Sequence, residues 1–375
     1  MANKIAKWIL SSHCSLALDI GSKYIKVMQF EQSGGVPVLH VAAIAPVPEG
    51  AIENGIIANK SAVVATLRKM LDKNQILGSE VWLAAGGPNL VLRWIEMPQM
   101  SEDDLREALK YEARKYLPFP IEHGVVDFKI LSRKAKQPEE TLRILLIAAP
   151  RALVDSRFEA VEAAGLKPIG MDVEPLAVLR ALEHDPTRSE LAWDGHPRAI
   201  LVFGSAGTDF YVTKGSDLEF ARRIPIGGRN LAKVIADNQS LDLAQTDERD
   251  IVRKISFDTE GRVLVDNADA QLRSAIESEI TRLDHEIERS CSYYQSLFPE
   301  GSYEGVLTQV TIAGGLAAMD GFQTHLTHEI DMVVDVADPL ARISLKHVSE
   351  GTGLLNGNRT LFIVSAGLLL GQLAD

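Results

Sequence analysis

The residues best suited to chemistry lie in the segment LALDIGSKYIKV, residues 16–27. We expect an apolar strand up to Asp19, a turn at Gly21 and Ser22, and a second strand from Ile25. Glycine has no Cβ, so backbone N–H groups at such a turn approach an anion closely. A carboxylate at the strand end is a ligand for hydrated Mg²⁺. The pattern predicts a phosphate site, but an ordinary hairpin turn has the same residue types.

A second segment of this kind begins after the middle of the chain. Residues 199–203 are apolar, residues 204–208 are small turn residues, and residues 210–213 form a further strand pattern. A late apolar stretch, residues 310–315, ends in two glycines. The repeated hairpin predicts a duplicated α/β fold in which glycine loops face each other across a cleft.

The length also favours two lobes, because single cores rarely grow beyond ~250 to 300 residues and this chain has 375. After Gly87 the residue pattern changes to that of a strand, a helix and two further strands, which predicts an inserted subdomain. We therefore expect a first lobe at residues 1–183, with its core at 1–87 and 151–183 and the insertion at 88–150, a linker at 184–197, and a second lobe at 198–375.

Composition and charge exclude several classes of function. The net charge of −12 argues against a nucleic-acid partner, which needs clustered Lys and Arg. Cys14 and Cys291 stand far apart and without CxxC spacing, which indicates a reducing compartment and no thiolate zinc site. The histidines show no metal-ligand spacing. The apolar windows at residues 1–10 and 361–373 are too short for an export signal or a membrane span. We expect a cytoplasmic protein without direct membrane insertion.

Longer motifs are more specific than the glycine pairs. EMP at residues 96–98 is followed by SEDDLREALKYEARKYLPFP at 101–120, and RIPIGG stands at 223–228. Two more are GLKPIGMDVEPLAVLRAL at 165–182 and AGGLAAMDGF at 313–322. With DIGSKYIKV, these motifs resemble the actin-like ATPase superfamily and, within it, the PilM family of type IV pilus assembly proteins, which is related to FtsA. The resemblance runs from about residue 16 to 373 and implies the duplicated, ribonuclease H-like two-lobe fold with the inserted subdomain of FtsA and PilM.

The resemblance also implies a site for ATP or ADP with Mg²⁺. Asp19 would orient Mg²⁺ through water. The implied nucleotide contacts are Gly21, Ser22 and Lys23 at the phosphates, Gly204 and Ser205 in the second phosphate loop, Gly228 at the ribose, Gly314 and Gly315 at the adenosine, and Lys254 at the adenine. Lys254 fits a solvated surface charge equally well.

Two departures from the family pattern bear on hydrolysis. Phe203 stands where we align the acidic residue of the second phosphate loop, and Leu316 replaces the third glycine of the adenosine motif. Phe203 binds neither a hydrated metal nor a water. We therefore expect nucleotide binding with slow or absent hydrolysis, and we assign no catalytic residue.

The resemblance implies an adaptor rather than an efficient enzyme. Such a protein binds the N-terminal cytoplasmic tail of a PilN-like bitopic membrane protein, lies at the inner membrane through that partner, and serves other platform or motor proteins of the pilus. Candidate contacts are Tyr111, Tyr116 and Phe119, although the helical spacing also fits Tyr116 in the core. An FtsA-like filament-forming division protein with self-association is the alternative, and a small-molecule kinase, which needs a general base, is a further one.

Overall fold

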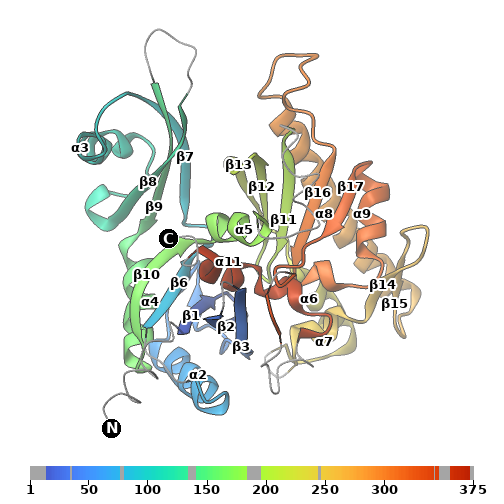
Figure 1. Ribbon diagram of the computed structural model, residues 1–375. Helices are drawn as coiled ribbons and strands as arrows, with labels where there is room; N and C mark the ends of the chain where they lie inside the picture. Colours follow the sequence, from blue (N-terminus) through green and yellow to red (C-terminus); the bar gives the residue numbers. More distant parts are fainter. Residues whose placement is uncertain are drawn as a thin grey trace.

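The computed structural model describes residues 14–33, 36–76, 80–133, 141–183, 196–243, 246–341, 343–345 and 355–371. It contains two five-stranded sheets (Figure 1). The first consists of β1 (Cys14–Ile20), β2 (Tyr24–Ser33), β3 (Val36–Pro46), β6 (Glu80–Ala85) and β10 (Lys167–Val173), in the order β10-β6-β1-β2-β3. The second consists of β11 (Arg198–Phe203), β12 (Thr208–Lys214), β13 (Asp217–Ile224), β16 (Gln309–Gly314) and β17 (Val333–Val336), in the order β13-β12-β11-β16-β17.

The two sheets repeat one topology, which confirms the predicted duplication. In each sheet the first strand pairs antiparallel with the second, and the second pairs antiparallel with the third. The first strand also has a parallel neighbour, which has a further parallel neighbour. Parallel neighbours need crossover connections. These contain α2 (Lys60–Lys73) and α4 (Arg151–Ala163) in the first half, and α6 (Gly228–Gln239), α7 (Glu248–Val252), α8 (Ala270–Gln295) and α9 (Phe322–Ile330) in the second.

The inserted subdomain has the predicted order of strand, helix, strand and strand. It consists of β7 (Val91–Pro98), α3 (Glu102–Glu112), the short helices η1 (Ala113–Lys115) and η2 (Ile121–His123), β8 (Gly124–Arg133) and β9 (Thr141–Pro150), with the strand order β7-β9-β8. Ser101 caps α3 by accepting from the Asp104 backbone N–H. Leu105 and Leu109 are buried against Ile144 in the subdomain core. The subdomain enters the chain between β6 and α4 (Arg151–Ala163).

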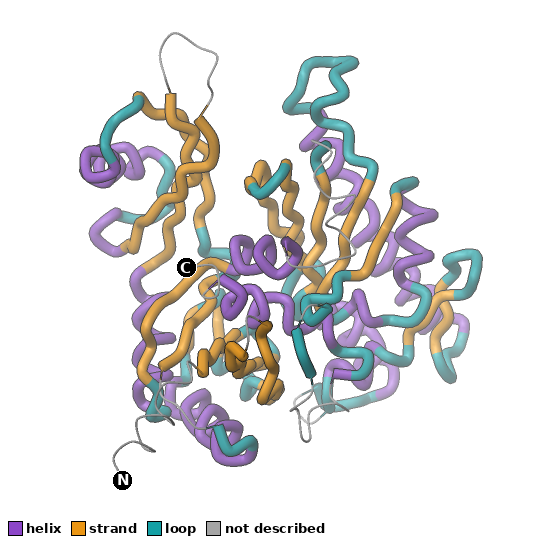
Figure 2. The backbone as a smooth tube through the Cα atoms, in the orientation of Figure 1, coloured by secondary structure: helices purple, strands orange, loops and turns teal. Residues whose placement is uncertain are grey.

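The last described helix, α11 (Ile363–Gly371), packs against α5 (Glu174–Glu183) and β1. The two helices lie between the sheets (Figure 1 and Figure 2). Ser344 likewise bonds the first sheet, accepting from the Leu39 N–H at 2.9 Å. This arrangement departs from the expected division, in which residues 198–375 formed the second lobe. α11 is apolar on every side, so packing against the second lobe alone would leave part of its apolar surface exposed.

The remaining described elements are small or peripheral to the sheets. They are β4 (Ile52–Glu53), β5 (Ile56–Ile57), β14 (Ile255–Phe257), β15 (Val263–Val265), η3 (Leu316–Ala318) and η4 (Arg359–Phe362). Residues 184–195 of the expected linker lie outside the described residues. The termini at 1–13 and 372–375, where two of the apolar windows begin or end, lie outside them as well.

Candidate functional site

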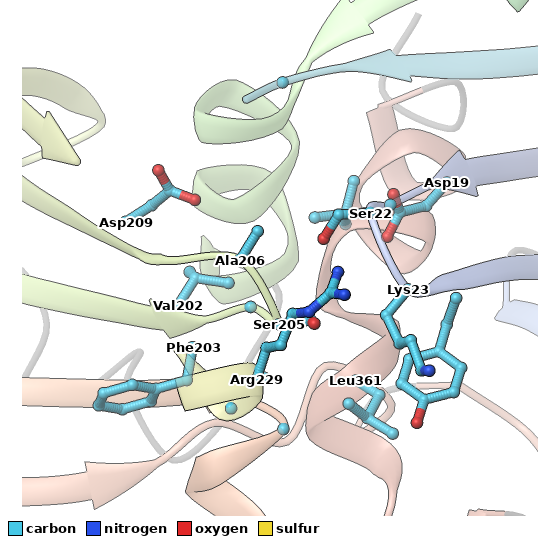
Figure 3. A pocket seen from close by; sticks show the side chains of 18 of the residues that line it. Asp19, Ser22, Lys23, Val202, Phe203, Ser205, Ala206, Asp209, Arg229 and Leu361 are labelled. Atoms are coloured by element: carbon cyan, nitrogen blue, oxygen red, sulfur yellow. The ribbon is translucent and has the colours of Figure 1, made fainter. Parts of the chain in front are cut away.

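A cavity of about 630 Å³ lies between the two sheets, where the loops after β1 and β11 face each other. Its wall includes nine of the ten residues that the sequence predicted, namely Asp19, Gly21, Ser22, Lys23, Gly204, Ser205, Gly228, Gly314 and Gly315. Figure 3 shows Asp19, Ser22 and Lys23 of the first loop opposite Ser205 of the second. The structure therefore brings together predicted residues from both halves of the chain.

Asp19 is held by a lysine that the sequence analysis did not single out. The Nζ atom of Lys26 donates to Oδ2 of Asp19 at 2.7 Å, and Asp19 is only 3% exposed. The two residues are direct partners in the antiparallel pairing of β1 with β2, so their side chains share one face. Counting outward from the turn at Gly21 and Ser22 would have found this lysine. Lys26 thus adds a cation to the cavity wall beside Asp19.

The first loop also contacts the second half of the chain directly. Lys23 Nζ donates to the Leu243 carbonyl at 3.3 Å, and the Tyr24 hydroxyl donates to Oδ1 of Asp247. Arg249 lies over the Tyr24 ring at 4.8 Å and forms an ion pair with Asp247. Burial opposes ionisation of Asp247, but hydrogen bonds from Arg249 and Tyr24 lower its pKa to about 2. An ionised carboxylate therefore joins the two halves at this edge of the cavity.

The second loop is fixed by backbone hydrogen bonds to the start of α6. Gly204 N–H donates to the Gly207 carbonyl at 2.9 Å, and Gly228 N–H donates to the Gly204 carbonyl at 3.0 Å. Arg229 N–H donates to the Ser205 carbonyl at 3.0 Å. The N-terminus of this 12-residue helix therefore opens at the loop. The positive end of the helix dipole therefore lies at the loop and favours an anion there.

Phe203 does not occupy the place that we expected for it. Its side chain is 1% exposed, packs edge-on against Phe322 with ring centroids 5.2 Å apart, and points away from the first loop (Figure 3). Both residues contribute to the cavity wall, but side chains alternate along a strand, so the Val202 side chain faces the cavity and the Phe203 ring does not (Figure 3). Its partner across the β11–β12 ladder is Asp209, whose two oxygens both accept from Arg223 Nη1 at 2.8 Å. The sequence reasoning was one residue out of register here.

Glu174, at the start of α5, is a further carboxyl group on the cavity wall that the sequence analysis missed. Gly86 makes room for it, because a Cβ at that position would overlap the carboxyl group. Burial, and then the negative charges of Asp19 and Asp209, raise the pKa of Glu174 to about 7. Its charge therefore changes close to neutral pH.

The end of the cavity expected to hold the base differs from the prediction. Lys254 is not part of the wall, and its Nζ donates to Gln239 Oε1 at 2.8 Å. The preceding residue, Arg253, lines the cavity and donates to Asn358 Oδ1 at 3.1 Å. Leu316 is 2% exposed and packs within the core of the second lobe. Leu316 also lines the cavity, and the apolar wall at this end includes Met319, Leu361, Ile363 and Val364 as well.

Gly314 is required by a close approach of two strands. Its φ angle is +88°, and a Cβ there would overlap the Phe203 carbonyl. The next residue, Gly315, donates its N–H to that carbonyl at 2.8 Å, and Thr360 Oγ1 donates to the Gly314 carbonyl at 3.0 Å. These contacts explain the glycine pair at the end of β16 and place the strand end at the cavity.

Metal binding at this site depends on Asp19. Among the described residues there is no cluster of three or more His, Cys, Asp or Glu that could hold a metal ion by itself. Asp19 nevertheless presents a carboxylate to the cavity, and Mg²⁺ is commonly held by one or two carboxylates together with water and phosphate oxygens. The residues present thus fit Mg²⁺ only in company with a phosphate ligand. In the described part of the chain, the helices are too short or too polar to span a bilayer.

Comparison with known proteins places these features in context. The family model for the type IV pilus assembly protein PilM matches residues 17–372. The cell division protein FtsA of Bacillus subtilis (strain 168) is 24% identical over 246 residues, which are 59% of this chain and 53% of FtsA, so the chain spans about half the length of that relative.

Solved structures show the same likeness at the level of the fold. The PilM–PilN type IV pilus biogenesis complex contains a chain with a TM-score of 0.80 and 23% identity, covering 96% of this chain and 98% of that one. The ethanolamine utilization protein EutJ of Carboxydothermus hydrogenoformans has a TM-score of 0.53 and 14% identity, covering 95% and 89%. The two-lobe fold is therefore shared with these proteins.

Proposed function

The chain belongs to the family of type IV pilus assembly proteins PilM and has the actin-like two-lobe fold, and from this premise we propose that it is a nucleotide-binding adaptor. Its nucleotide would be ATP or ADP, held in the cavity between the glycine loops. Its partner would be the N-terminal cytoplasmic tail of a PilN-like membrane protein. The protein would thus lie in the cytoplasm at the inner membrane and serve other proteins of the pilus machine.

The single observation that supports nucleotide binding is that two glycine loops face each other across one cavity. The first loop brings Gly21 to the wall and the adjoining strand β2 brings Lys26, while the second loop brings Ser205 and leads to the N-terminus of α6. Arg229 extends toward the first loop from the second lobe (Figure 3). Two facing loops with cations suit a ligand with consecutive phosphates, and the apolar end beyond Gly315 suits a base.

Weak or absent hydrolysis is supported by the chemistry of the β11 end. The Val202 side chain, rather than the Phe203 ring, faces the cavity there (Figure 3), and Asp209 is already engaged by Arg223. An apolar side chain neither orients a water nor takes part in a metal shell. Mg²⁺, held through water by Asp19, would neutralise charge on the phosphates when bound. This wall has therefore lost one of the groups that hydrolysis would use.

Partner binding is supported by the family and by the inserted subdomain. A solved relative is a PilM–PilN complex, and this chain has the whole fold of its PilM-like chain. Tyr111 on α3 is 72% exposed, whereas Tyr116 packs against the subdomain core, as the alternative interpretation of its spacing held. We propose Tyr111 and Phe119 as the places to look for a peptide contact. Self-association of an FtsA-like kind is the second candidate, since FtsA is 24% identical over part of the chain.

Calorimetric titration with ADP and with ATP, each with and without Mg²⁺, tests the nucleotide proposal, and phosphate release is measured on the same sample. Asp19→Ala is expected to abolish Mg²⁺-dependent tightening, while the exposed Asp103→Ala leaves it unchanged. Absence of any heat of binding with the folded protein would overturn the proposal. A labelled peptide of the partner's tail, with a scrambled peptide as control, tests the adaptor role by fluorescence anisotropy, and sedimentation tests self-association.

A further inference from the structure

Strand β13 connects the inserted subdomain with the cavity. Its first residues touch β7 and β9 of the subdomain, and its last residues touch the second glycine loop. It is also an edge strand, hydrogen-bonded to β12 on one side in the described sheet. The two ends therefore have contacts of very different kinds.

The subdomain end is a bridge of three hydrogen bonds. Trp94 on β7 donates its indole N–H to the Leu218 carbonyl at 2.6 Å. Arg143 on β9 donates from Nη1 and Nη2 to the two oxygens of Glu219, at 2.6 and 2.7 Å. The Arg143 and Glu219 side chains are 23% and 15% exposed, so solvent screens this pair less than a surface pair. A two-point contact of this kind fixes orientation as well as distance.

The cavity end is packed against the loop backbone. A Cβ at Gly207 would lie 2.8 Å from the Ile224 carbonyl and 3.2 Å from Arg223 Nε, so the glycine allows β13 to approach the loop. Arg223 at the same time holds both oxygens of Asp209 on the cavity wall. Just beyond the strand, a Cβ at Gly227 would lie 2.5 Å from the Gly204 carbonyl. The loop has little room to shift unless the end of β13 shifts with it.

Only three residues separate Glu219 from Arg223, and all three are paired with β12, whereas the register of the ladder shifts at Glu219 itself. At about 3.3 Å per residue, the two contacts lie on the order of 13 Å apart along a stiff element. A displacement at one end is therefore transmitted to the other rather than absorbed in a flexible connection.

We infer that β13 couples occupancy of the cavity to the position of the inserted subdomain. The inference rests on the proposed nucleotide binding. A nucleotide that contacts both glycine loops holds the lobes together and so favours the bridged arrangement of Trp94, Arg143 and Glu219. By linkage, the bridge raises nucleotide affinity by the same factor by which nucleotide favours the bridge. A partner bound to the subdomain would alter nucleotide affinity through the same strand.

Charge reversal at the bridge tests the inference in the full chain. Calorimetry gives the ADP dissociation constant, and hydrogen exchange by mass spectrometry reports on residues 91–98 and 141–150 with and without ADP. Arg143→Glu and Glu219→Arg alone are each expected to raise the ADP dissociation constant about fivefold or more, within the usual range of coupling. ADP should slow exchange in the subdomain strands of the natural protein but not of these variants.

The double variant R143E/E219R is expected to recover most of the ADP affinity and most of the slowing of subdomain exchange by ADP. Glu102→Gln, which breaks the exposed Glu102–Arg106 pair on α3, is the matched control and should behave as the natural protein does. Circular dichroism identifies any variant that fails to fold, and Trp94→Phe, which removes the indole N–H together with its five-membered ring, then takes its place. Equal ADP affinity in all variants, with subdomain exchange indifferent to ADP, would overturn the coupling alone. Failure of the natural protein to bind ADP would instead remove the proposed function and the coupling with it.

Discussion

Lys26 and Asp19 lie opposite each other on neighbouring strands, with 2.7 Å between Nζ and Oδ2. Both line the cavity. The lysine is therefore positioned for an anionic ligand, and the carboxylate for the cation that accompanies this ligand. The pair is therefore a part of the site that can be tested by itself.

Replacement of Lys26 by Met keeps the aliphatic stem and removes the charge. We expect ADP to bind about tenfold to a hundredfold more weakly, because charge-assisted hydrogen bonds contribute ~1.5 to 3 kcal/mol. Calorimetry with ADP measures the change. Lys110→Met, on the exposed face of α3, is the control. Unchanged affinity for ADP in the folded K26M variant would show that this lysine serves only Asp19.

Val202→Asp would place an acidic group on the cavity face of β11. We expect Mg²⁺-dependent phosphate release from ATP to rise at least severalfold, since the new carboxylate can join the hydration shell of the metal or orient a water. Val202→Asn, similar in shape but without charge, is the control. If V202D folds, binds ATP and releases phosphate no faster, the residue at position 202 does not limit hydrolysis.

The Glu174 carboxyl predicts a pH dependence. Its folded-state pKa is raised to about 7, above the ordinary value of 4.5, first by burial and then by Asp19 and Asp209. The folded state thus holds this proton more tightly than the unfolded chain does. The stability contribution is fully present below pH 4.5 and is lost as the pH rises through 7.

We therefore expect Glu174→Gln to raise the melting temperature at pH 8 by a few degrees and to have less effect at pH 5. The same substitution should flatten the fall in ADP affinity between pH 6 and pH 8, since the ionised carboxylate repels phosphate. Glu162→Gln, on the exposed side of α4, provides the comparison. A melting temperature that is lowered equally at both pH values would contradict the predicted pKa.

Gly314→Ala is expected to destabilise the protein by about 3 kcal/mol or more. It combines a left-handed φ of +88°, costing ~1 to 2 kcal/mol, with an overlap on the Phe203 carbonyl. Gly301→Ala has a similar φ of +77° but open space around the new methyl group, so only the conformational cost should appear. Urea unfolding compares the two. Equal losses of unfolding free energy in the two variants would mean that the ends of β11 and β16 move apart easily.

Much of this architecture was predictable because it repeats or follows local rules. Two hairpins with glycine turns predicted the duplicated sheets, and the pattern after Gly87 predicted the strand, helix, strand and strand of the insertion. Lys26 was equally within reach, because a hairpin turn determines which residues face each other. It was overlooked in favour of Lys23, which is nearer to the turn.

Other site residues depend on contacts that local patterns do not specify. Val202 and Phe203 are both apolar, and only the ladder with β12 shows which one faces the cavity. Glu174 reaches the site because α5 begins beside Gly86, and Arg253 replaces Lys254 through the end of a five-residue helix. Each of these depends on the placement of elements distant in the sequence.

The position of α11 has a consequence for the order in which the protein is made. This helix packs on β1 and α5, whose residues leave the ribosome far earlier, and residues 363–370 are buried there. During synthesis the first sheet must wait, with part of its apolar surface uncovered, until nearly all of the described chain has emerged. The nascent first lobe is thus a candidate client for chaperones that shield apolar surface, and a chain interrupted before α11 would keep that need.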